Sequence, residues 1–286
     1  MRICIVGAGK MGAFLADTMC LLHEVAVYDV DVKKLQYVFN TRRLTTFEEI
    51  SKFDPELLIN AVTLKYTLKT FEDVLPYVSE RCMLSDIASV KTGLLEFYKK
   101  SGRPFVSTHP MFGPTFANLR DLHENHAVII TEGDHLGRVF FKDLYGSLGL
   151  QLHEFSFEEH DEMMTYSLSI PFVSSMVFAA SMKKTDAPGT TFAKHLAIAK
   201  GVLSEDDYLV SEILFSPYTP EKVKNVISQM EDLLEIIKRR DSAEMSKYLN
   251  RLRENIKQSG GGWPPAISLS GDMNSQVACR HFMSER

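Results

Sequence analysis

The sequence of 286 residues has few cysteines, one tryptophan, no long hydrophobic run and no surplus of basic residues. Its four cysteines (Cys4, Cys20, Cys82 and Cys279) are scattered without the CxxC spacing of redox and zinc motifs. They predict neither a disulfide framework nor a metal site. Reduced thiols of this kind are typical of a cytoplasmic protein.

Two further absences narrow the functional class. The longest apolar run, Ile170 to Met182, contains serines and is shorter than the roughly 20 residues of a membrane span. Strand-like sequence begins at Arg2, so we expect no signal peptide. The net charge of −5 argues against a general nucleic-acid binder. Since 45% of the residues are hydrophobic and 24% are charged, we expect a soluble globular protein.

The first 156 residues alternate short apolar runs with amphipathic stretches. Helical patterns such as Met11–Leu22, Leu68–Val74 and Thr92–Lys100 lie between most of the runs. This alternation predicts an α/β domain with a mainly parallel sheet and helices on both faces. The expected strands are Ile3–Val6, Glu24–Tyr28, Leu57–Ala61, Met83–Ser85, Phe105–Ser107, Ala127–Thr131 and Leu150–Phe155.

After Phe155 the apolar residues recur at helical spacing, most clearly over Val223–Ile237. We therefore expect three parts: a dinucleotide-binding domain over residues 1–156, an all-helical domain over 157–257, and a flexible tail over 258–286. The wide apolar stripe of the helical part predicts a homodimer.

A glycine-rich motif follows the first expected strand. Gly7 is suited to the tight turn, Gly9 to a close approach of the backbone to a pyrophosphate, and Gly12 to close packing of helix against strand. The alternative is a glycine turn that binds no nucleotide. The motif consists of Gly7, Ala8, Gly9, Lys10, Met11 and Gly12.

An acidic residue ends the second expected strand. Asp29 is placed to accept hydrogen bonds from the adenosine ribose, as in NAD-binding domains. No arginine follows it at once, and Lys33 and Lys34 lie a turn further on. Because a carboxylate repels a 2′-phosphate, this pattern favours NAD over NADP.

Two polar motifs lie where later strands end, at the edge of an open α/β sheet that binds ligands. One runs from Ser85 to Lys91, and the other, Ser107 to Pro114, contains His109 followed by proline. A histidine at a strand end, beside a nicotinamide, is a candidate acid or base. The alternative is a structural loop histidine.

These motifs together resemble the prephenate dehydrogenases, especially the dehydrogenase part of bacterial T-proteins. The resemblance covers roughly residues 1–257. Its elements are Gly7–Gly12, the DIASVK motif at Asp86–Lys91, the HPMFGP motif at His109–Pro114, and Glu159-His160-Asp161 followed by Met164-Thr165-Tyr166.

The resemblance implies an NAD-dependent oxidative decarboxylation of prephenate to 4-hydroxyphenylpyruvate, on the route to tyrosine. It places His109 at the ring hydroxyl as the base and Ser89 beside that hydroxyl and the nicotinamide. His160 matches a family histidine that contacts substrate, with helix capping as the alternative. Lys91 either fixes its own loop or contacts an anion.

The chain departs from the family pattern at two positions. The family's carboxylate-binding arginine falls at Gly201, and a second family histidine falls at Phe172. We expect the positive charge for the substrate to come from Lys200, with Lys194 and His195 as further candidates, although a solvated basic face is the alternative.

The sequence therefore predicts a monofunctional prephenate dehydrogenase without a chorismate mutase domain. It predicts NAD as cofactor, no metal, and no nucleic-acid or membrane partner. Two alternatives remain: an arogenate dehydrogenase with the same chemistry on an amino substrate, and a nucleotide-binding regulatory protein without catalysis.

Overall fold

A computed structural model describes the chain except for residues 113–121 and 259–286. The chain divides into two compact units, residues 1–225 and a second unit that begins at Val226. The last two residues of the HPMFGP motif and almost all of the predicted tail lie outside the described residues.

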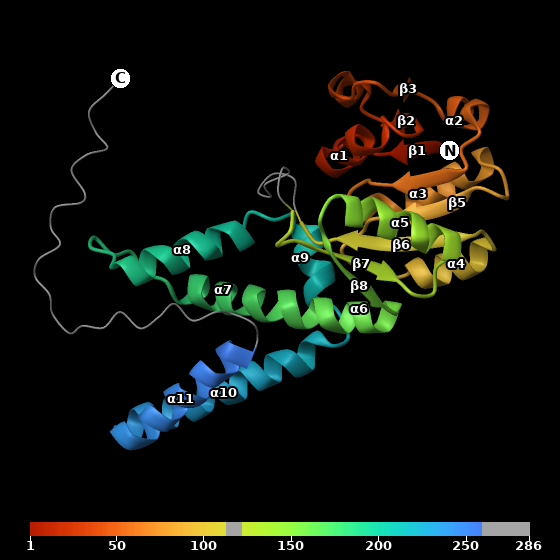
Figure 1. The fold of residues 1–286 in the computed structure, drawn as a ribbon. Helices are drawn as coiled ribbons and strands as arrows, with labels where there is room; N and C mark the ends of the chain where they lie inside the picture. Colours follow the sequence, from red (N-terminus) through yellow and green to blue (C-terminus); the bar gives the residue numbers. More distant parts are fainter. Residues whose placement is uncertain (113–121, 259–286) are drawn as a thin grey trace, which may run out of the picture. The chain divides into compact units, whose positions relative to one another are not determined.

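The first unit is built on one sheet whose strands follow the order β3-β2-β1-β4-β5-β6-β7-β8 (Figure 1). All neighbouring pairs are parallel except β6 and β7, which are antiparallel. The order reverses between β1 and β4, where open α/β sheets bind ligands. The strands are β1 (Arg2–Val6), β2 (Glu24–Tyr28), β3 (Arg42–Leu44), β4 (Leu57–Asn60), β5 (Met83–Asp86), β6 (Phe105–Pro110), β7 (His126–Ile130) and β8 (Gln151–Phe155).

All seven predicted strands are present, and the mainly parallel α/β sheet is confirmed. The strand that the sequence did not indicate is β3, a three-residue edge strand in which only Leu44 is buried. A strand this short and exposed shows no alternation of apolar and polar residues by which the sequence would predict it. β6 continues three residues beyond its predicted end, so that His109 lies in the sheet itself.

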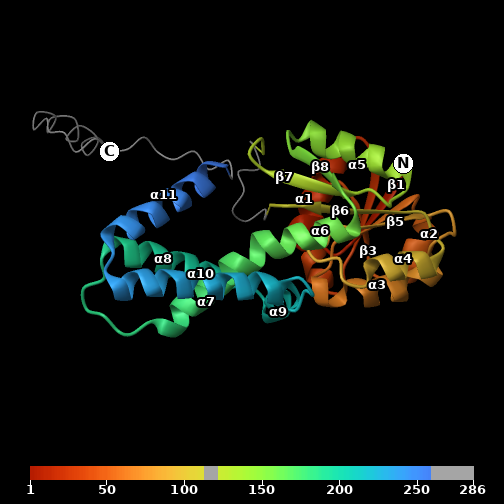
Figure 2. The ribbon, with the colours of Figure 1, turned by 90° about the horizontal axis from the view of Figure 1, so that it is seen from below.

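Helices cover both faces of the sheet (Figure 2). Strand side chains alternate between the two faces: Ile3 and Ile5 pack with α1 and α5, whereas Cys4 and Val6 pack with α2, α3 and α4. Both faces are therefore closed to water. The helices are α1 (Lys10–Met19), α2 (Phe47–Phe53), α3 (Thr67–Val74), α4 (Leu94–Ser101) and α5 (His135–Ser147).

The chain is helical beyond β8, as predicted. α6 (Phe157–Met164) continues through a π-helical turn (Thr165–Ser169) into α7 (Ile170–Ser181). Pro171 lacks the N–H that an α-helical ladder requires at this point, and π turns are frequent at functional sites. Two further helices follow, α8 (Thr190–Val202) and α9 (Asp207–Leu214).

The continuous helix from Phe157 to Ser181 has the length and apolar composition of a membrane span. By themselves these properties are weak evidence, because core helices of soluble proteins share them. This helix also buries His160, Thr165 and Ser169 within the protein. Buried, hydrogen-bonded polar groups suit a helix that packs on other protein elements.

The second unit consists of a helical pair. It starts within α10 (Thr219–Arg239) and continues with α11 (Ser242–Gln258). The predicted stripe on α10 is present, and Ile227, Met230, Leu234 and Ile237 each expose about half of their surface.

Candidate functional site

The glycine motif lies at the reversal point of the sheet. Gly7, directly after β1, has a φ of 109°, and a Cβ there would lie 2.7 Å from the carbonyl oxygen of Ala61. A Cβ on Gly12 would overlap the carbonyl oxygen of Gly7. Gly9 caps α1 and faces open space. Two glycines thus permit the tight packing, and the third leaves the helix N-terminus accessible to an anion.

Asp29 is buried at the end of β2 and holds this loop in place. Its Oδ2 accepts a hydrogen bond of 2.8 Å from the backbone N–H of Ala8, and its Oδ1 accepts one of 2.8 Å from Asp31 N–H. The Lys34 Nζ lies 3.8 Å from Oδ2. A carboxylate oxygen has two lone pairs, so Asp29 retains the capacity to accept ribose hydroxyls.

A cavity of about 410 Å³ opens beside the motif. Its size and its mainly apolar walls suit an adenosine moiety. Lys10 is exposed and Met11 is half-buried at the start of α1, outside this cavity. The cavity is lined by Val6, Gly7, Gly9, Tyr28, Asp29, Val30, Lys34, Phe47, Ala61, Val62, Thr63, Tyr66, Lys69, Thr70 and Asp73.

A buried polar network joins the ends of β5 and β6. The Asp86 carboxylate accepts hydrogen bonds from Lys91 Nζ at 2.5 Å and from the Tyr98 hydroxyl at 2.7 Å. Lys91 also donates to the Thr108 carbonyl at 2.7 Å. The side chains of Lys91 and Asp86 are both fully buried. Lys91 therefore fixes the DIASVK loop against β6, the first of the two roles considered for it.

His109 lies within β6 and is only 6% exposed. Burial lowers its pKa well below the usual value, and the neighbouring His160 and Lys91 act in the same direction. The imidazole is therefore neutral at pH 7, which is the form that accepts a proton. Its Nδ1 lies 3.1 Å from His160 Nε2.

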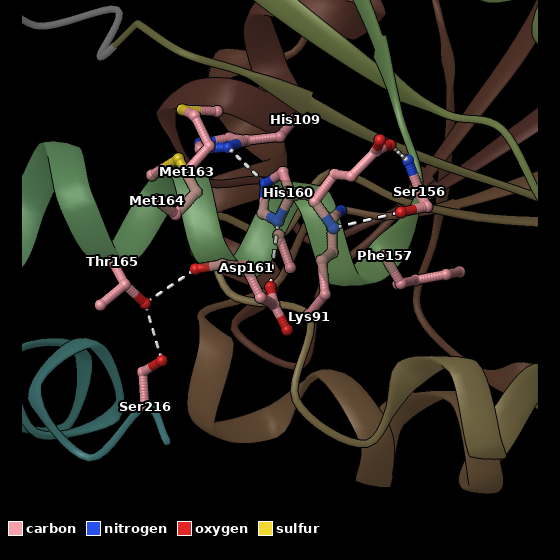
Figure 3. A network of polar contacts seen from close by, with 12 residues as sticks. Lys91, His109, Ser156, Phe157, His160, Asp161, Met163, Met164, Thr165 and Ser216 are labelled. Atoms are coloured by element: carbon pink, nitrogen blue, oxygen red, sulfur yellow. Dashed lines mark hydrogen bonds and ion pairs between the residues drawn. The ribbon is translucent and has the colours of Figure 1, made fainter. Parts of the chain in front are cut away.

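His160 is fully buried on α6, and it does not cap that helix. The cap is Ser156, whose hydroxyl accepts from Glu159 N–H while the Glu159 carboxylate accepts from Ser156 N–H. The His160 Nδ1 lies 3.0 Å from Asp161 Oδ1 (Figure 3). Burial lowers the pKa of His160, against the raising effect of its bond to Asp161.

Ser89 lies in the loop after β5 and lines a cavity that also includes Asp161, the carboxylate that contacts His160. The hydrogen bond of His109 within the described chain goes to His160, not to Ser89. Two acidic side chains, Asp161 and Glu212, line the same cavity, whose walls include no lysine or arginine among the described residues. Its lining consists of Ser89, Val90, Thr92, Asp161, Met164, Thr165, Glu212, Ile213, Ser216 and Pro217.

The basic candidates lie elsewhere, on α8. Lys194, His195 and Lys200 are exposed, and none of them lines the cavity that contains Ser89. The His195 Nδ1 lies 3.0 Å from the carbonyl oxygen of Thr191, one turn back on the same helix. Gly201 faces open space. The structure thus joins His109 to His160, places Ser89 on a cavity wall that it shares with Asp161, and leaves the three α8 side chains exposed.

Three side chains of this region received no role from the sequence. Tyr98 falls on the buried face of α4, four residues after Leu94, and this helical spacing is the signal that could have placed it beside Asp86. In the sequence, the only signal for Asp161 was its place next to His160. Glu212 had no signal, because its place in the cavity depends on the packing of α9.

The sheet order, the glycine loop and the buried acidic residue after β2 define a dinucleotide-binding α/β protein. Residues 23–148 match the sequence model of the prephenate dehydrogenase nucleotide-binding domain. The predicted resemblance to the prephenate dehydrogenase family is therefore confirmed over this segment, which corresponds to that family's nucleotide-binding domain.

Curated relatives and solved structures agree with this assignment. The chain is 26% identical to a probable arogenate/prephenate dehydrogenase of Methanocaldococcus jannaschii over 70% of this chain and 48% of that protein. It is 25% identical to a T-protein of Haemophilus influenzae over 45% of this chain and 34% of that protein. The chain thus spans half or less of the length of these curated relatives.

The fold matches two solved dehydrogenases. The prephenate dehydrogenase of A. aeolicus, in complex with hydroxyphenyl propionate and NAD+, has a TM-score of 0.77 at 18% identity, over 91% of this chain and 98% of that one. The arogenate dehydrogenase of Synechocystis has a TM-score of 0.74 at 17% identity, over 91% and 100%. At these identities the likeness establishes the fold.

Proposed function

We propose that this protein catalyses the NAD-dependent oxidative decarboxylation of prephenate to 4-hydroxyphenylpyruvate, a step of tyrosine biosynthesis. The observation that carries the proposal is His109: a buried, neutral histidine at the ligand-binding edge of a prephenate dehydrogenase nucleotide-binding domain. The reaction needs a base at this edge, because a hydroxyl proton must leave as the hydride leaves.

The residues present fit NAD. Gly7, Gly9 and Gly12 form the cradle at the N-terminus of α1, where Lys10 and Met11 add backbone N–H groups, and Asp29 lies at the wall of the adjoining cavity. When bound, NAD supplies the acceptor for the hydride. The related A. aeolicus enzyme was solved with NAD+. Asp29 disfavours a 2′-phosphate, so we expect NAD to be preferred over NADP.

His109 takes the proton of the substrate's ring hydroxyl on Nε2, the ring nitrogen that does not face His160. The C4–H bond breaks with its electron pair leaving as hydride, and the hydroxyl oxygen becomes a carbonyl. The bond between the ring and its carboxylate then breaks, and CO2 leaves. The electron pair of that bond enters the ring and turns the carbonyl into a phenolate oxygen, which takes back the proton from His109 to give the phenol. Ser89, at the neighbouring cavity, is placed to orient the hydroxyl.

The carboxylates of the substrate need positively charged side chains to bind them. Lys200, Lys194 and His195 are the sequence's candidates, and all three are exposed on α8. We propose Lys200 as the first of them, because it lies next to the family's arginine position at Gly201.

The test is the absorbance of reduced nicotinamide with purified protein in four pairings: prephenate or arogenate with NAD or NADP. A rise with prephenate and NAD supports the proposal. A rise with arogenate alone means that arogenate is the substrate and that the reaction type is unchanged. No rise in any pairing, from folded protein that still binds NAD, supports the regulatory alternative.

One observation favours arogenate as a second candidate. The cavity beside Ser89 carries Asp161 and Glu212, and its described walls lack basic side chains. A carboxylate attracts the ammonium group that arogenate carries in place of the keto oxygen of prephenate, whereas both substrates carry the same two carboxylates. A Glu212→Gln variant separates the candidates, since it should weaken arogenate turnover more than prephenate turnover.

We further propose a homodimer formed through the helical part. The support is the half-exposed apolar stripe of α10, with Ile227, Met230, Leu234 and Ile237. Light scattering on the purified chain tests this, and Met230→Glu with Leu234→Glu should give monomers. We propose a soluble, cytoplasmic protein, in keeping with its unpaired cysteines Cys4, Cys20 and Cys82.

A further inference from the structure

Two histidines and a carboxylate form a continuous chain of polar contacts at the site (Figure 3). Asp161 Oδ1 lies 3.0 Å from His160 Nδ1, and His160 Nε2 lies 3.1 Å from His109 Nδ1. Both imidazoles are buried, whereas a third of the Asp161 side chain is exposed. The chain thus runs from an accessible carboxylate to a buried ring.

The proton positions along this row of hydrogen bonds follow from the ionised carboxylate at its end. An ionised carboxylate only accepts hydrogen bonds, so His160 carries its proton on Nδ1. A neutral imidazole has one N–H, and His160 Nε2 is therefore an acceptor. The bond to His109 then requires that His109 donates from Nδ1. Consequently His109 Nε2 carries the lone pair.

Burial is what makes this deduction possible. The pKa of each imidazole is lowered, with desolvation as the largest cause, so each ring carries a single proton at pH 7. The charged groups that face the pair are Lys91, Asp161 and, through Lys91, Asp86. Lys91 lowers the pKa of both rings and thereby opposes a doubly protonated state.

We propose that His160 and Asp161 are positioning residues that hold His109 in the tautomer whose Nε2 accepts the substrate's proton. This replaces the direct substrate contact that the sequence predicted for His160, because its two ring nitrogens are both engaged within the protein. The role in turnover rests on the proposed function, whereas the tautomer itself does not.

The surrounding structure keeps the pair in register. The capping box of Ser156 and Glu159 fixes the start of α6, one turn before His160. Beyond it, the Thr165 hydroxyl lies 2.7 Å from the Asp161 carbonyl and 2.7 Å from the Ser216 hydroxyl. No cluster of three metal-ligating side chains occurs among the residues that the structure describes, so a shared metal does not explain the pairing.

The direct test is the 15N NMR spectrum of the full chain labelled at histidine, at pH 7.5 and without substrate. Protonated and unprotonated ring nitrogens differ in chemical shift, and a His109→Asn sample assigns the His109 signals among the nine histidines. We expect the proton on Nδ1 and a bare Nε2. A proton on Nε2 overturns the proposal.

Two matched pairs of variants connect the tautomer with turnover. The thioether of His160→Met accepts a hydrogen bond only weakly, whereas the side-chain oxygen of His160→Gln accepts one well. His160→Met should lower kcat about 10- to 100-fold with little change in KM, and His160→Gln should retain most of kcat. Asp161→Ala should let both tautomers of His109 appear, whereas Glu162→Ala, at the adjacent exposed position, should not.

The two proposals fail separately. If the spectrum shows the expected tautomer but no substrate is turned over, the proposed function is wrong. The proposed positioning of His109 by His160 and Asp161 then still holds. Two outcomes would refute the positioning role of His160 and Asp161 and leave the proposed function intact. One is turnover while Nε2 of His109 is protonated, and the other is an equal loss of kcat in His160→Met and His160→Gln. If His160→Met does not fold, the wild-type and Asp161→Ala spectra decide.

Discussion

The central strands and α8 differ sharply in how they hold their side chains. Every residue of β4 is buried, and the neighbouring strands are nearly as closed. In α8, by contrast, Ala199 is the only buried residue of thirteen. Side chains at the strand ends are therefore held in place by their neighbours, whereas most side chains of α8 face solvent.

Under the proposed function, this difference divides the chemistry between the two regions. Proton transfer depends on geometry within fractions of an ångström, and it is assigned to β6 and α6 through His109 and His160. Charge attraction tolerates looser geometry, and its candidates are the solvated cations of α8. The following predictions test this division, from the largest expected effect to the smallest.

His109→Asn should lower kcat by about 10²–10⁴, because the amide cannot accept the hydroxyl proton. The affinity for NAD, measured by calorimetry, should change little, since His109 lies outside the cavity at Asp29. Initial rates of nicotinamide reduction measure the effect. Unchanged turnover would remove His109 from the mechanism.

Lys91→Met should lower the free energy of unfolding by about 3–5 kcal/mol, because it leaves Asp86 buried without its ionic partner. Urea unfolding of the two proteins gives the difference. The double variant Asp86→Asn with Lys91→Met removes both charges and should recover part of the loss. A loss below about 1 kcal/mol would mean that the network does not hold the strand ends together.

Lys200→Ala should raise KM for the substrate about 2- to 5-fold and leave kcat unchanged, as expected for an exposed charge. Lys194→Ala is the matched control on the same helix, one to two turns away. Steady-state kinetics on both variants measures the effect. If only Lys194→Ala raises KM, the cation that serves the substrate has been misassigned.

Much of the nucleotide half could be predicted because its signals are local. Gly7 and Gly12 are required by contacts with residues a few positions away or on the adjacent strand, and the strands around them are short apolar runs. β3 could not be predicted, since a three-residue edge strand with one buried side chain leaves no pattern.

The site itself was only partly predictable. His109 could be singled out from its motif, but its bond to His160 joins residues 51 positions apart and depends on how α6 packs against β6. The resemblance placed Lys200 beside the family's arginine position at Gly201, with Lys194 and His195 nearby, but a match of positions does not show which way a helix faces. Contacts between distant elements are set by tertiary packing, and one sequence does not reveal them.

The central claim is that a neutral, desolvated histidine pair supplies the base. The pH dependence of kcat/KM for nicotinamide reduction tests it most directly, in wild type and in His160→Gln. Since burial lowers the pKa of both His109 and His160, the base stays neutral as the pH falls below 6.5. We therefore predict an acidic limb with an apparent pKa below 6.5 that shifts in His160→Gln. A limb at or above 6.5, identical in both proteins, would contradict the account.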